Sequence, residues 1–137
     1  MVKIIITGHG KFSDGVLDSI NFIMGIQKDI VKVEFSNIDL DTYSNQIEDI
    51  IKNSKQGALI FTDLMGGTPC RISTLLCTKY DNVYVITGAN VPMIIESIIK
   101  RNSIPLKELT EQITDIGKNG IQVFDKQLII EKSKNIK

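Results

Sequence analysis

The only histidine of this 137-residue chain, His9, lies where an apolar run ends. The run from Val2 to Thr7 is typical of a strand buried on both faces. Gly8 and Gly10 flank the histidine and indicate the turn that leaves this strand. One imidazole is thus expected at the carboxyl end of a strand, where ligands and chemistry gather in an open α/β sheet. The alternative is that it is only a polar turn residue.

A second loop with functional residue types follows the apolar segment 58–62, which is typical of a buried strand. This loop runs from Asp63 through two glycines to Thr68 and Pro69. Thr68 is expected as the N-cap of a helix and Pro69 as its first residue, so free N–H groups would point into the loop and could bind an anion. Taken alone, the aspartate could instead be a cap or turn former, and the glycines ordinary turn residues.

Together the two loops predict a phosphoryl-transfer site if the first and third strands are neighbours. Asp63 could then accept a hydrogen bond from His9 Nδ1, which leaves the lone pair on Nε2 and makes the histidine an oriented nucleophile. Gly10, Gly67 and Thr68 would donate hydrogen bonds to the phosphoryl oxygens. No metal or organic cofactor is expected, because such a transfer relies on placement and charge stabilisation.

Other chemistries lack their characteristic residues. A serine hydrolase would need a GxSxG elbow, and dinucleotide binding would need GxGxxG, whereas the glycines after the first strand fall at positions 8, 10 and 15. There is no GxxxxGK(S/T) phosphate loop, and a receiver-type phosphoacceptor would need paired acids where His9 stands. Cys70 and Cys77 have neither a CxxC pattern nor a histidine beside them, which argues against zinc.

Hydrophobic periodicity predicts the elements that would position these loops. The expected strands are residues 2–7, 30–35, 58–62, 83–87 and 121–124. The expected helices start near Ser13, Asp39 or Asp41, Thr68, Asn90 and Pro105. The alternation in 30–35 indicates an edge position or one solvent-exposed face. This order favours a three-layer α/β fold with a mainly parallel sheet and helices on both faces.

Length and charge narrow the class of protein. The chain fits one domain, placed at residues 1–124, followed by a loosely held tail at 125–137 whose apolar residues 128–130 could add a strand or contact another subunit. Sixteen basic and sixteen acidic residues cancel, so no net field would attract nucleic acid or anionic lipid. No leader or long apolar segment is seen, and a soluble cytoplasmic protein with reduced cysteines is expected.

Three motifs, in order, resemble one known family. They are Gly8-His9-Gly10, the loop Asp63-Leu64-Met65-Gly66-Gly67-Thr68-Pro69, and Gly88-Ala89-Asn90-Val91-Pro92-Met93. Over roughly residues 1–124 they are similar to the enzyme IIA domain of the mannose (mannose–fructose–sorbose) family of the bacterial phosphoenolpyruvate-dependent sugar phosphotransferase system (PTS). The resemblance implies a sheet of four parallel strands plus an antiparallel edge strand, in a homodimer.

The resemblance also implies a function and partners. His9 would accept a phosphoryl group on Nε2 from the histidine-containing phosphocarrier protein HPr and pass it to a IIB protein, which phosphorylates sugar entering through the membrane components IIC and IID. Asp63 matches the family's histidine-orienting carboxylate, and Thr68 matches a residue that meets the phosphoryl group. Because no alanine- and proline-rich linker or IIB domain follows, IIB would be a separate polypeptide.

Two other functions on the same fold stay open. The chain could be a regulatory binding module in which phosphorylation of His9 acts as a switch. It could also be the phosphoryl-donor subunit of a dihydroxyacetone kinase, although the Gly-Gly-Thr-Pro loop speaks against it. The resemblance leaves the sugar open, because the family's membrane components select it.

Overall fold

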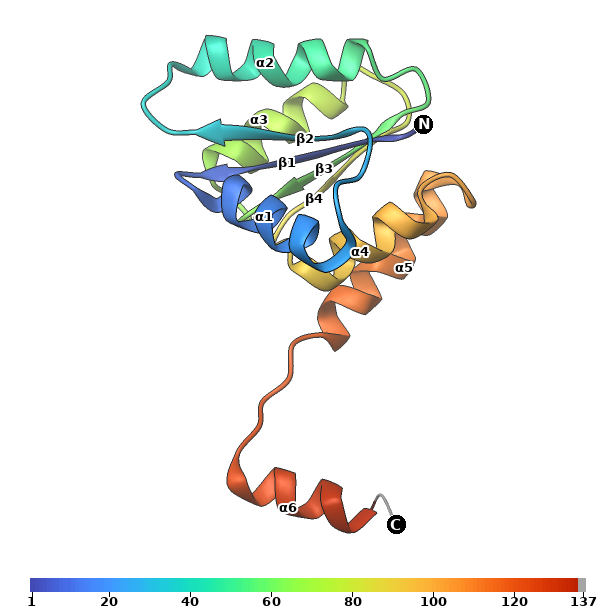
Figure 1. Ribbon diagram of the computed structural model, residues 1–137. Helices are drawn as coiled ribbons and strands as arrows, with labels where there is room; N and C mark the ends of the chain where they lie inside the picture. Colours follow the sequence, from blue (N-terminus) through green and yellow to red (C-terminus); the bar gives the residue numbers. More distant parts are fainter. Residues whose placement is uncertain (136–137) are drawn as a thin grey trace.

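Strands and helices alternate through most of the chain in the computed structural model, which describes residues 1–135 (Figure 1). The strands are β1 (Lys3–His9), β2 (Ile30–Phe35), β3 (Ala58–Thr62) and β4 (Val83–Ile86). The helices are α1 (Phe12–Met24), α2 (Leu40–Lys52), α3 (Thr68–Cys77), α4 (Val91–Lys100), α5 (Leu106–Asn119) and α6 (Lys126–Asn135). Within the described part of the chain, every helix is too short or too polar to span a lipid bilayer.

All four strands are parallel, in the order β2-β1-β3-β4. The mainly parallel α/β prediction is confirmed, and β2 lies at an edge, which is one of the two placements that its alternating pattern indicated. β1 is central, with β2 on one side and β3 on the other. The chain leaves β1 and β3 toward opposite faces, so the carboxyl ends of these two strands form the switch point at which open α/β sheets bind ligands.

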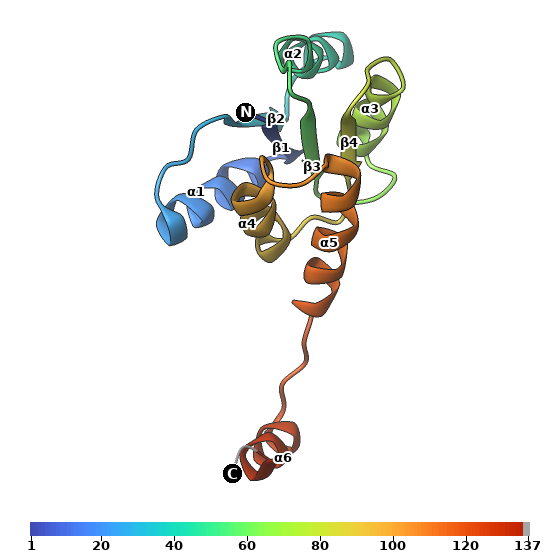
Figure 2. The same cartoon turned by 90° about the vertical axis from the view of Figure 1, so that its right-hand side faces the viewer.

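Helices cover both faces of the sheet. Figure 2 shows α2 and α3 on one face, and α1, α4 and α5 on the other. Successive residues of a strand point to opposite faces, so the apolar run of β1 contributes to two cores. Ile4 and Ile6 pack toward α1, α4 and α5, whereas Ile5 packs toward α2 and α3. The central strands are therefore packed on both faces, and this packing fixes the positions of their carboxyl ends.

Two helices begin with the side-chain caps that the sequence predicted. Asp39 accepts a hydrogen bond from the Thr42 N–H at 2.8 Å at the start of α2. Asn90 accepts one from the Met93 N–H at 3.3 Å at the start of α4. Each side-chain oxygen satisfies an N–H group that has no partner inside its helix.

Two other predicted caps are wrong. Ser13 lies inside α1 and is fully buried, because β1 continues to His9 and the helix starts before Ser13. Thr68 is the first residue of α3, and Gly67, with an extended backbone (φ −74°, ψ 167°), takes the N-cap position. The ring of His9 lies so close to Gly67 that a side chain there would collide with it.

The C-terminal segment also differs from its prediction. Residues 121–124 form no strand, and residues 128–130 lie in the helix α6. Figures 1 and 2 show this segment running away from the domain, so no strand of the same chain is beside it to accept its backbone hydrogen bonds. The expected antiparallel edge strand is therefore not formed within residues 1–135. The last two residues of the predicted tail, 136 and 137, lie outside the described residues.

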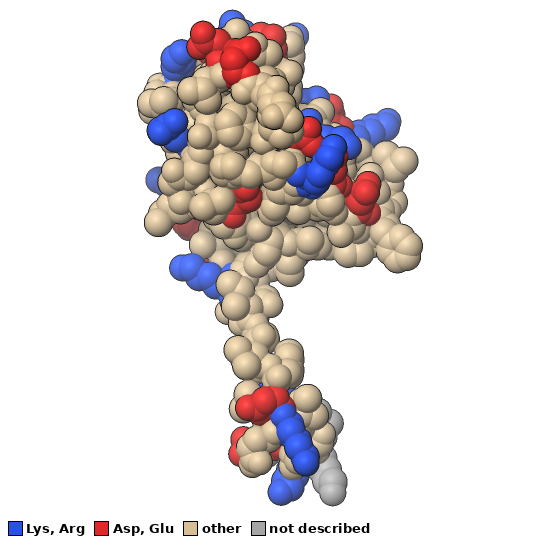
Figure 3. Space-filling view, turned by 90° about the vertical axis from the view of Figure 1, so that its left-hand side faces the viewer, with Lys and Arg blue, Asp and Glu red and all other residues tan. Residues whose placement is uncertain are grey.

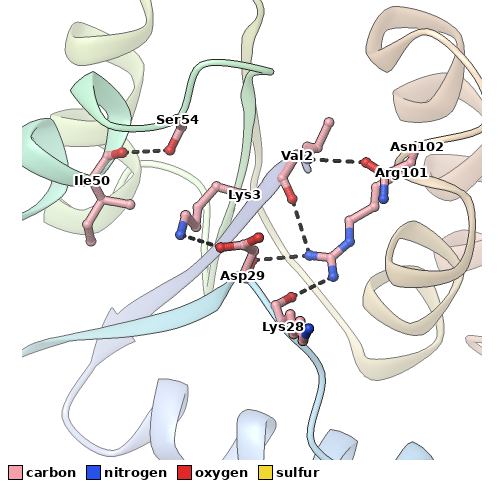
Figure 4. Close-up of polar contacts among 8 residues, drawn as sticks. All are labelled: Val2, Lys3, Lys28, Asp29, Ile50, Ser54, Arg101 and Asn102. Atoms are coloured by element: carbon pink, nitrogen blue, oxygen red, sulfur yellow. Dashed lines mark hydrogen bonds and ion pairs between the residues drawn. The ribbon is translucent and has the colours of Figure 1, made fainter.

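A buried arginine ties the amino-terminal edge of the sheet together (Figure 4). Arg101, which follows α4, is 3% exposed, and burial lowers the pKa of its guanidinium while the charge of Asp29 opposes that shift. Its guanidinium donates to three backbone carbonyl oxygens, those of Val2 (3.2 Å), Asp29 (3.1 Å) and Lys28 (2.5 Å). These contacts join α4 to the starts of β1 and β2, and so support the register in which the two strands pair.

Replacing Arg101 by methionine is expected to lower the free energy of unfolding by about 1–3 kcal/mol, because buried carbonyl oxygens lose a charged donor. Urea denaturation measures the difference. Lys107→Met, at an exposed position of α5, is the control and should change stability by less than about 0.5 kcal/mol. If the Arg101 variant were as stable as the wild type, the guanidinium would make no net contribution to the fold.

Candidate functional site

His9 and Asp63 meet at the carboxyl edge of the sheet. His9 is the last residue of β1, and Asp63 directly follows β3. The two strands are hydrogen-bonded neighbours, with Thr7 paired to Thr62. The arrowheads of both strands point to this edge on the left of Figure 1. The structure therefore confirms that the first and third strands are neighbours and that the two side chains come together.

A short hydrogen bond joins the two side chains. His9 Nδ1 lies 2.8 Å from Asp63 Oδ2. Because an ionised carboxylate can only accept, the neutral ring in this contact carries its proton on Nδ1 and its lone pair on Nε2. The His9 side chain is 45% exposed, whereas that of Asp63 is 12% exposed. A ring held in this way can use Nε2 as a nucleophile, and the carboxylate stabilises the positive charge that the ring then acquires.

Asp63 is itself held by backbone N–H groups. Its Oδ2 accepts from the His9 N–H at 2.9 Å, and its Oδ1 accepts from the Leu64 N–H at 3.0 Å. Burial by itself raises the pKa of Asp63, but the hydrogen bonds and charge of His9 and the Leu64 N–H outweigh it, so the pKa of the carboxyl lies below its usual value. The carboxylate is therefore charged at neutral pH and fixed in orientation.

Two glycines make the close approach possible. A Cβ atom on Gly8 would lie 3.0 Å from Asp63 Cγ and 2.6 Å from Phe12 Cδ2. A Cβ atom on Gly67 would lie 2.7 Å from His9 Cε1. Only glycine at position 8 lets the carboxylate reach the ring, and only glycine at position 67 lets the ring lie against the start of α3. The sequence marked Gly8 merely as a turn residue, because nothing local shows which side chain passes over it.

The first turn of α3 adjoins the reactive edge of the ring. A Cβ atom on Gly67 would also lie 3.5 Å from His9 Nε2, and Thr68 and Pro69 are the next two residues. N–H groups of a first helical turn lack partners inside the helix, and the helix dipole adds partial positive charge. The helix start at which the sequence predicted anion binding thus lies next to Nε2, and Gly67 and Thr68 stay candidate donors.

Gly10 has a different role from the one expected. Its N–H donates to the carbonyl oxygen of Phe35 at 3.0 Å, so it is already bonded to the neighbouring strand. Its φ of +55° lies in the left-handed region that favours glycine. Gly10 forms the turn between β1 and α1, and because its N–H is bonded to Phe35 it is not a donor to a phosphoryl group.

Charged side chains beside the site are paired. Lys11 Nζ lies 3.2 Å from Glu34 Oε1 and 3.6 Å from Asp14 Oδ2, and Lys32 Nζ lies 2.9 Å from Asp14 Oδ1. The hydrogen bond to Glu34, more than any other contact, raises the pKa of Lys11. Figure 3, which looks onto this side of the molecule, shows basic and acidic groups next to each other. Lys11, close to His9 in the chain, therefore has its charge balanced by carboxylates.

One neighbour of His9 was not predicted as part of the site. The ring of Phe35 lies in a T-shaped contact with the imidazole, with centroids 5.8 Å apart. The sequence predicted the strand that carries Phe35 but not its register against β1, which depends on contacts distant in the chain.

Cys70 and Cys77 are free thiols, and within residues 1–135 no group of three His, Cys, Asp or Glu could hold a metal ion.

The fold and the site define a class: a doubly wound α/β protein with a carboxylate-held histidine at its switch point. A family model described as the PTS system fructose IIA component, EIIA-man, matches residues 3–114. The chain belongs to this family, the mannose-family IIA components of the PTS. IIA components are phosphotransfer proteins that work with other PTS proteins. The family that the three motifs indicated is confirmed.

Relatives of this kind match over most of the chain. The PTS system fructose-specific EIIA component of Bacillus subtilis is 24% identical over 138 residues, which cover 98% of this chain and 94% of the relative. The PTS system mannose-specific EIIAB component of Escherichia coli is 24% identical over 129 residues, which cover 90% of this chain and 39% of that protein. The first relative has a length similar to that of this chain, and the second is much longer.

Solved structures share the fold. EIIA of Streptococcus agalactiae superposes with a TM-score of 0.85 at 30% identity, covering 90% of this chain and 98% of that one. The mannose/sorbose specific IIA subunit from Enterococcus faecalis superposes with a TM-score of 0.78 at 26% identity, covering 90% and 95%. The chain is thus similar to these IIA proteins in sequence and in structure.

Proposed function

We propose that the protein is a phosphocarrier that accepts a phosphoryl group from phospho-HPr on His9 Nε2 and passes it to a separate IIB protein. The observation that carries this proposal is the 2.8 Å contact between Nδ1 and Asp63, which leaves Nε2 free beside Gly67. IIB would phosphorylate sugar admitted by the membrane components IIC and IID, so the carrier would work in the cytoplasm. Relatives are named for fructose, mannose and sorbose.

In the proposed reaction, the Nε2 lone pair attacks the phosphorus of the donor phosphohistidine in line with the donor nitrogen. The Nε2–P bond forms as the donor P–N bond breaks, and the bonding pair returns to the donor ring. The proton on Nδ1 stays in its hydrogen bond to Asp63, so the phosphorylated ring is a cation paired with a carboxylate. Gly67 and Thr68 donate to the phosphoryl oxygens, and an acceptor group on IIB then displaces His9 in the same manner.

A two-step labelling experiment tests this function. Purified protein is mixed with radiolabelled phospho-HPr, and IIB from the same genome is added afterwards. The chain is expected to take up label and then to lose it to IIB. A wild-type chain that takes no label would refute the phosphocarrier proposal. Label that stays on the chain after IIB is added would favour the regulatory switch. In a parallel reaction a dihydroxyacetone kinase subunit replaces IIB, and transfer of label to that subunit would favour the donor-subunit hypothesis.

We also propose a homodimer in which the C-terminal segment of one copy supplies the antiparallel edge strand of the other. β4 is the last strand of the described sheet, so its outer edge can pair with an added strand. A hollow of about 540 Å³ lies between β4 and α5, lined by residues that include Tyr84 and Thr110. Ile121, Val123 and Phe124 are 60–77% exposed in the single chain, and pairing with a second copy would bury them.

Removal of residues 121–137 is expected to convert the dimer into a monomer, because the exchanged strand is lost while the two cores stay intact. Sedimentation equilibrium of the full and shortened chains measures this, and circular dichroism checks that the shortened chain is folded. A full-length chain that sediments as a monomer, or a shortened chain that still dimerises, would contradict the exchange.

A further inference from the structure

The imidazole of His9 contacts an aromatic ring that no step of the proposed reaction uses. The centroids of His9 and Phe35 are 5.8 Å apart and their planes are inclined by 83°, a T-shaped arrangement. Such pairs attract each other through the aromatic quadrupole and prefer defined orientations. Phe35 is partly buried, so the contact extends from the apolar core to the exposed histidine.

The backbone brings these two rings together. His9 and Phe35 are register partners, as the last residues of β1 and β2, and paired residues of parallel strands project from the same face. The Gly10 N–H donates to the Phe35 carbonyl oxygen at 3.0 Å, which fixes the strand ends beside each other. The contact is therefore built into the sheet and is not a chance meeting of surface side chains.

A rigid support lies behind Phe35. Its ring packs against Tyr43 of α2, with centroids 4.8 Å apart, and Tyr43 is fully buried. The Tyr43 hydroxyl is hydrogen-bonded to Thr7 Oγ1 at 2.5 Å, and Thr7 Oγ1 donates to the Val33 carbonyl oxygen at 2.6 Å. Burial raises the pKa of Tyr43 to about 12, so this hydroxyl stays neutral and bonded over the physiological range. Phe35 therefore has little freedom to move away from the histidine.

We propose that Phe35 is a positioning residue for phosphoryl transfer, which holds the His9 ring so that Nε2 faces the start of α3. The hydrogen bond to Asp63 fixes the ring at one atom, around which an exposed imidazole could still tilt. The Phe35 ring and the backbone at Gly67 limit that tilt. This inference rests on the proposed function, and it assigns a role in the site to an aromatic residue of the core.

Phe35→Leu tests the role, because leucine keeps apolar volume but removes the flat ring. At saturating phospho-HPr, the rate of His9 phosphorylation is expected to fall about threefold to tenfold, the range that corresponds to an aromatic pair, while the KM for phospho-HPr stays unchanged. Phe35→Tyr keeps the ring and should restore most of the rate. Ile47 is a fully buried residue of α2 in the same core. Ile47→Val therefore controls for lost stability and should leave the rate unchanged.

A second measurement does not depend on phosphorylation. Nuclear relaxation at the His9 Cε1–H group of unphosphorylated protein reports the mobility of the ring, which is expected to rise in Phe35→Leu and to stay at the wild-type level in Ile47→Val. If the wild type takes no label, the phosphocarrier proposal fails, and this measurement still decides whether Phe35 orients the ring. Unchanged ring mobility in Phe35→Leu, or an equal loss of rate in Ile47→Val, would overturn the positioning role.

Discussion

His9→Ala is expected to abolish labelling by phospho-HPr, to the background of a reaction without the protein. The chain has one histidine, so the variant has no other imidazole that could replace the lost nucleophile. Acid-labile label on the purified variant, after a fixed time with radiolabelled phospho-HPr, is the measurement. Removing the nucleophile of an enzyme can cost about 10⁶-fold in rate, and about 10³-fold would already be visible.

The variant should stay folded, because the imidazole is 45% exposed and lies at the rim of the sheet. Far-UV circular dichroism and urea denaturation are the controls. A folded His9→Ala protein that still takes up label would move the phosphoryl acceptor to another residue. Label found on Asp63 as an acyl phosphate would be an instance of that result, and hydroxylamine sensitivity would identify it.

Asp63→Asn is expected to lower the rate of phosphoryl transfer by about 10²- to 10⁴-fold, the range seen when an orienting carboxylate is replaced by an amide. The asparagine NH2 group can donate to Nδ1, which would place the ring proton on Nε2 and block the nucleophile. The carboxylate that stabilises the phosphorylated ring is lost as well. Single-turnover labelling with phospho-HPr measures the rate.

The stability of the same variant has a characteristic pH dependence. The pKa of Asp63 is lowered in the folded protein, so the carboxylate stabilises the fold above its unfolded pKa of about 4, and this contribution is lost as the pH falls through the folded value. The stability gap between wild type and Asp63→Asn should therefore be constant near neutral pH and shrink in acid.

A transfer rate of Asp63→Asn equal to that of the wild type would remove Asp63 from the mechanism.

The core of the site could be predicted from local patterns. The strands that carry His9 and Asp63 are short apolar runs, and the residues just after such runs lie at the carboxyl edge of a parallel sheet. The order of strands and helices favoured a parallel sheet, whereas the neighbouring position of β1 and β3 was a condition of the predicted site, which the structure fulfils. The parallel sheet could be predicted because it depends on local periodicity and on the common topology of alternating strands and helices.

What the sequence did not predict depends on contacts between distant segments. Thr68 was expected to cap α3 with its side chain. The N-cap position is instead occupied by Gly67, against which the His9 ring lies. Gly10 was expected to offer its N–H to a ligand, yet the register of β2 gives that N–H to Phe35. The same register places Phe35 beside the histidine, and no local pattern reveals it.

The strand predicted at residues 121–124 is absent for a related reason. Residues 121–124 have a strand-like sequence, but a strand forms only beside a partner that accepts its hydrogen bonds. In the single chain the segment extends away from the sheet, so its backbone has no such partner there (Figure 1). Strand propensity and strand formation are separate properties, and a second copy is the partner we propose.

The proposed transfer depends on which ring nitrogen of His9 is free to react. Nuclear magnetic resonance of the phosphorylated protein, with nitrogen-15 in its single histidine, identifies the nitrogen bonded to phosphorus from the phosphorus–nitrogen coupling. Phosphorus on Nε2, with the proton retained on Nδ1, is the predicted result, because Asp63 occupies Nδ1 at 2.8 Å. Phosphorus on Nδ1, or on a residue other than His9, would contradict it.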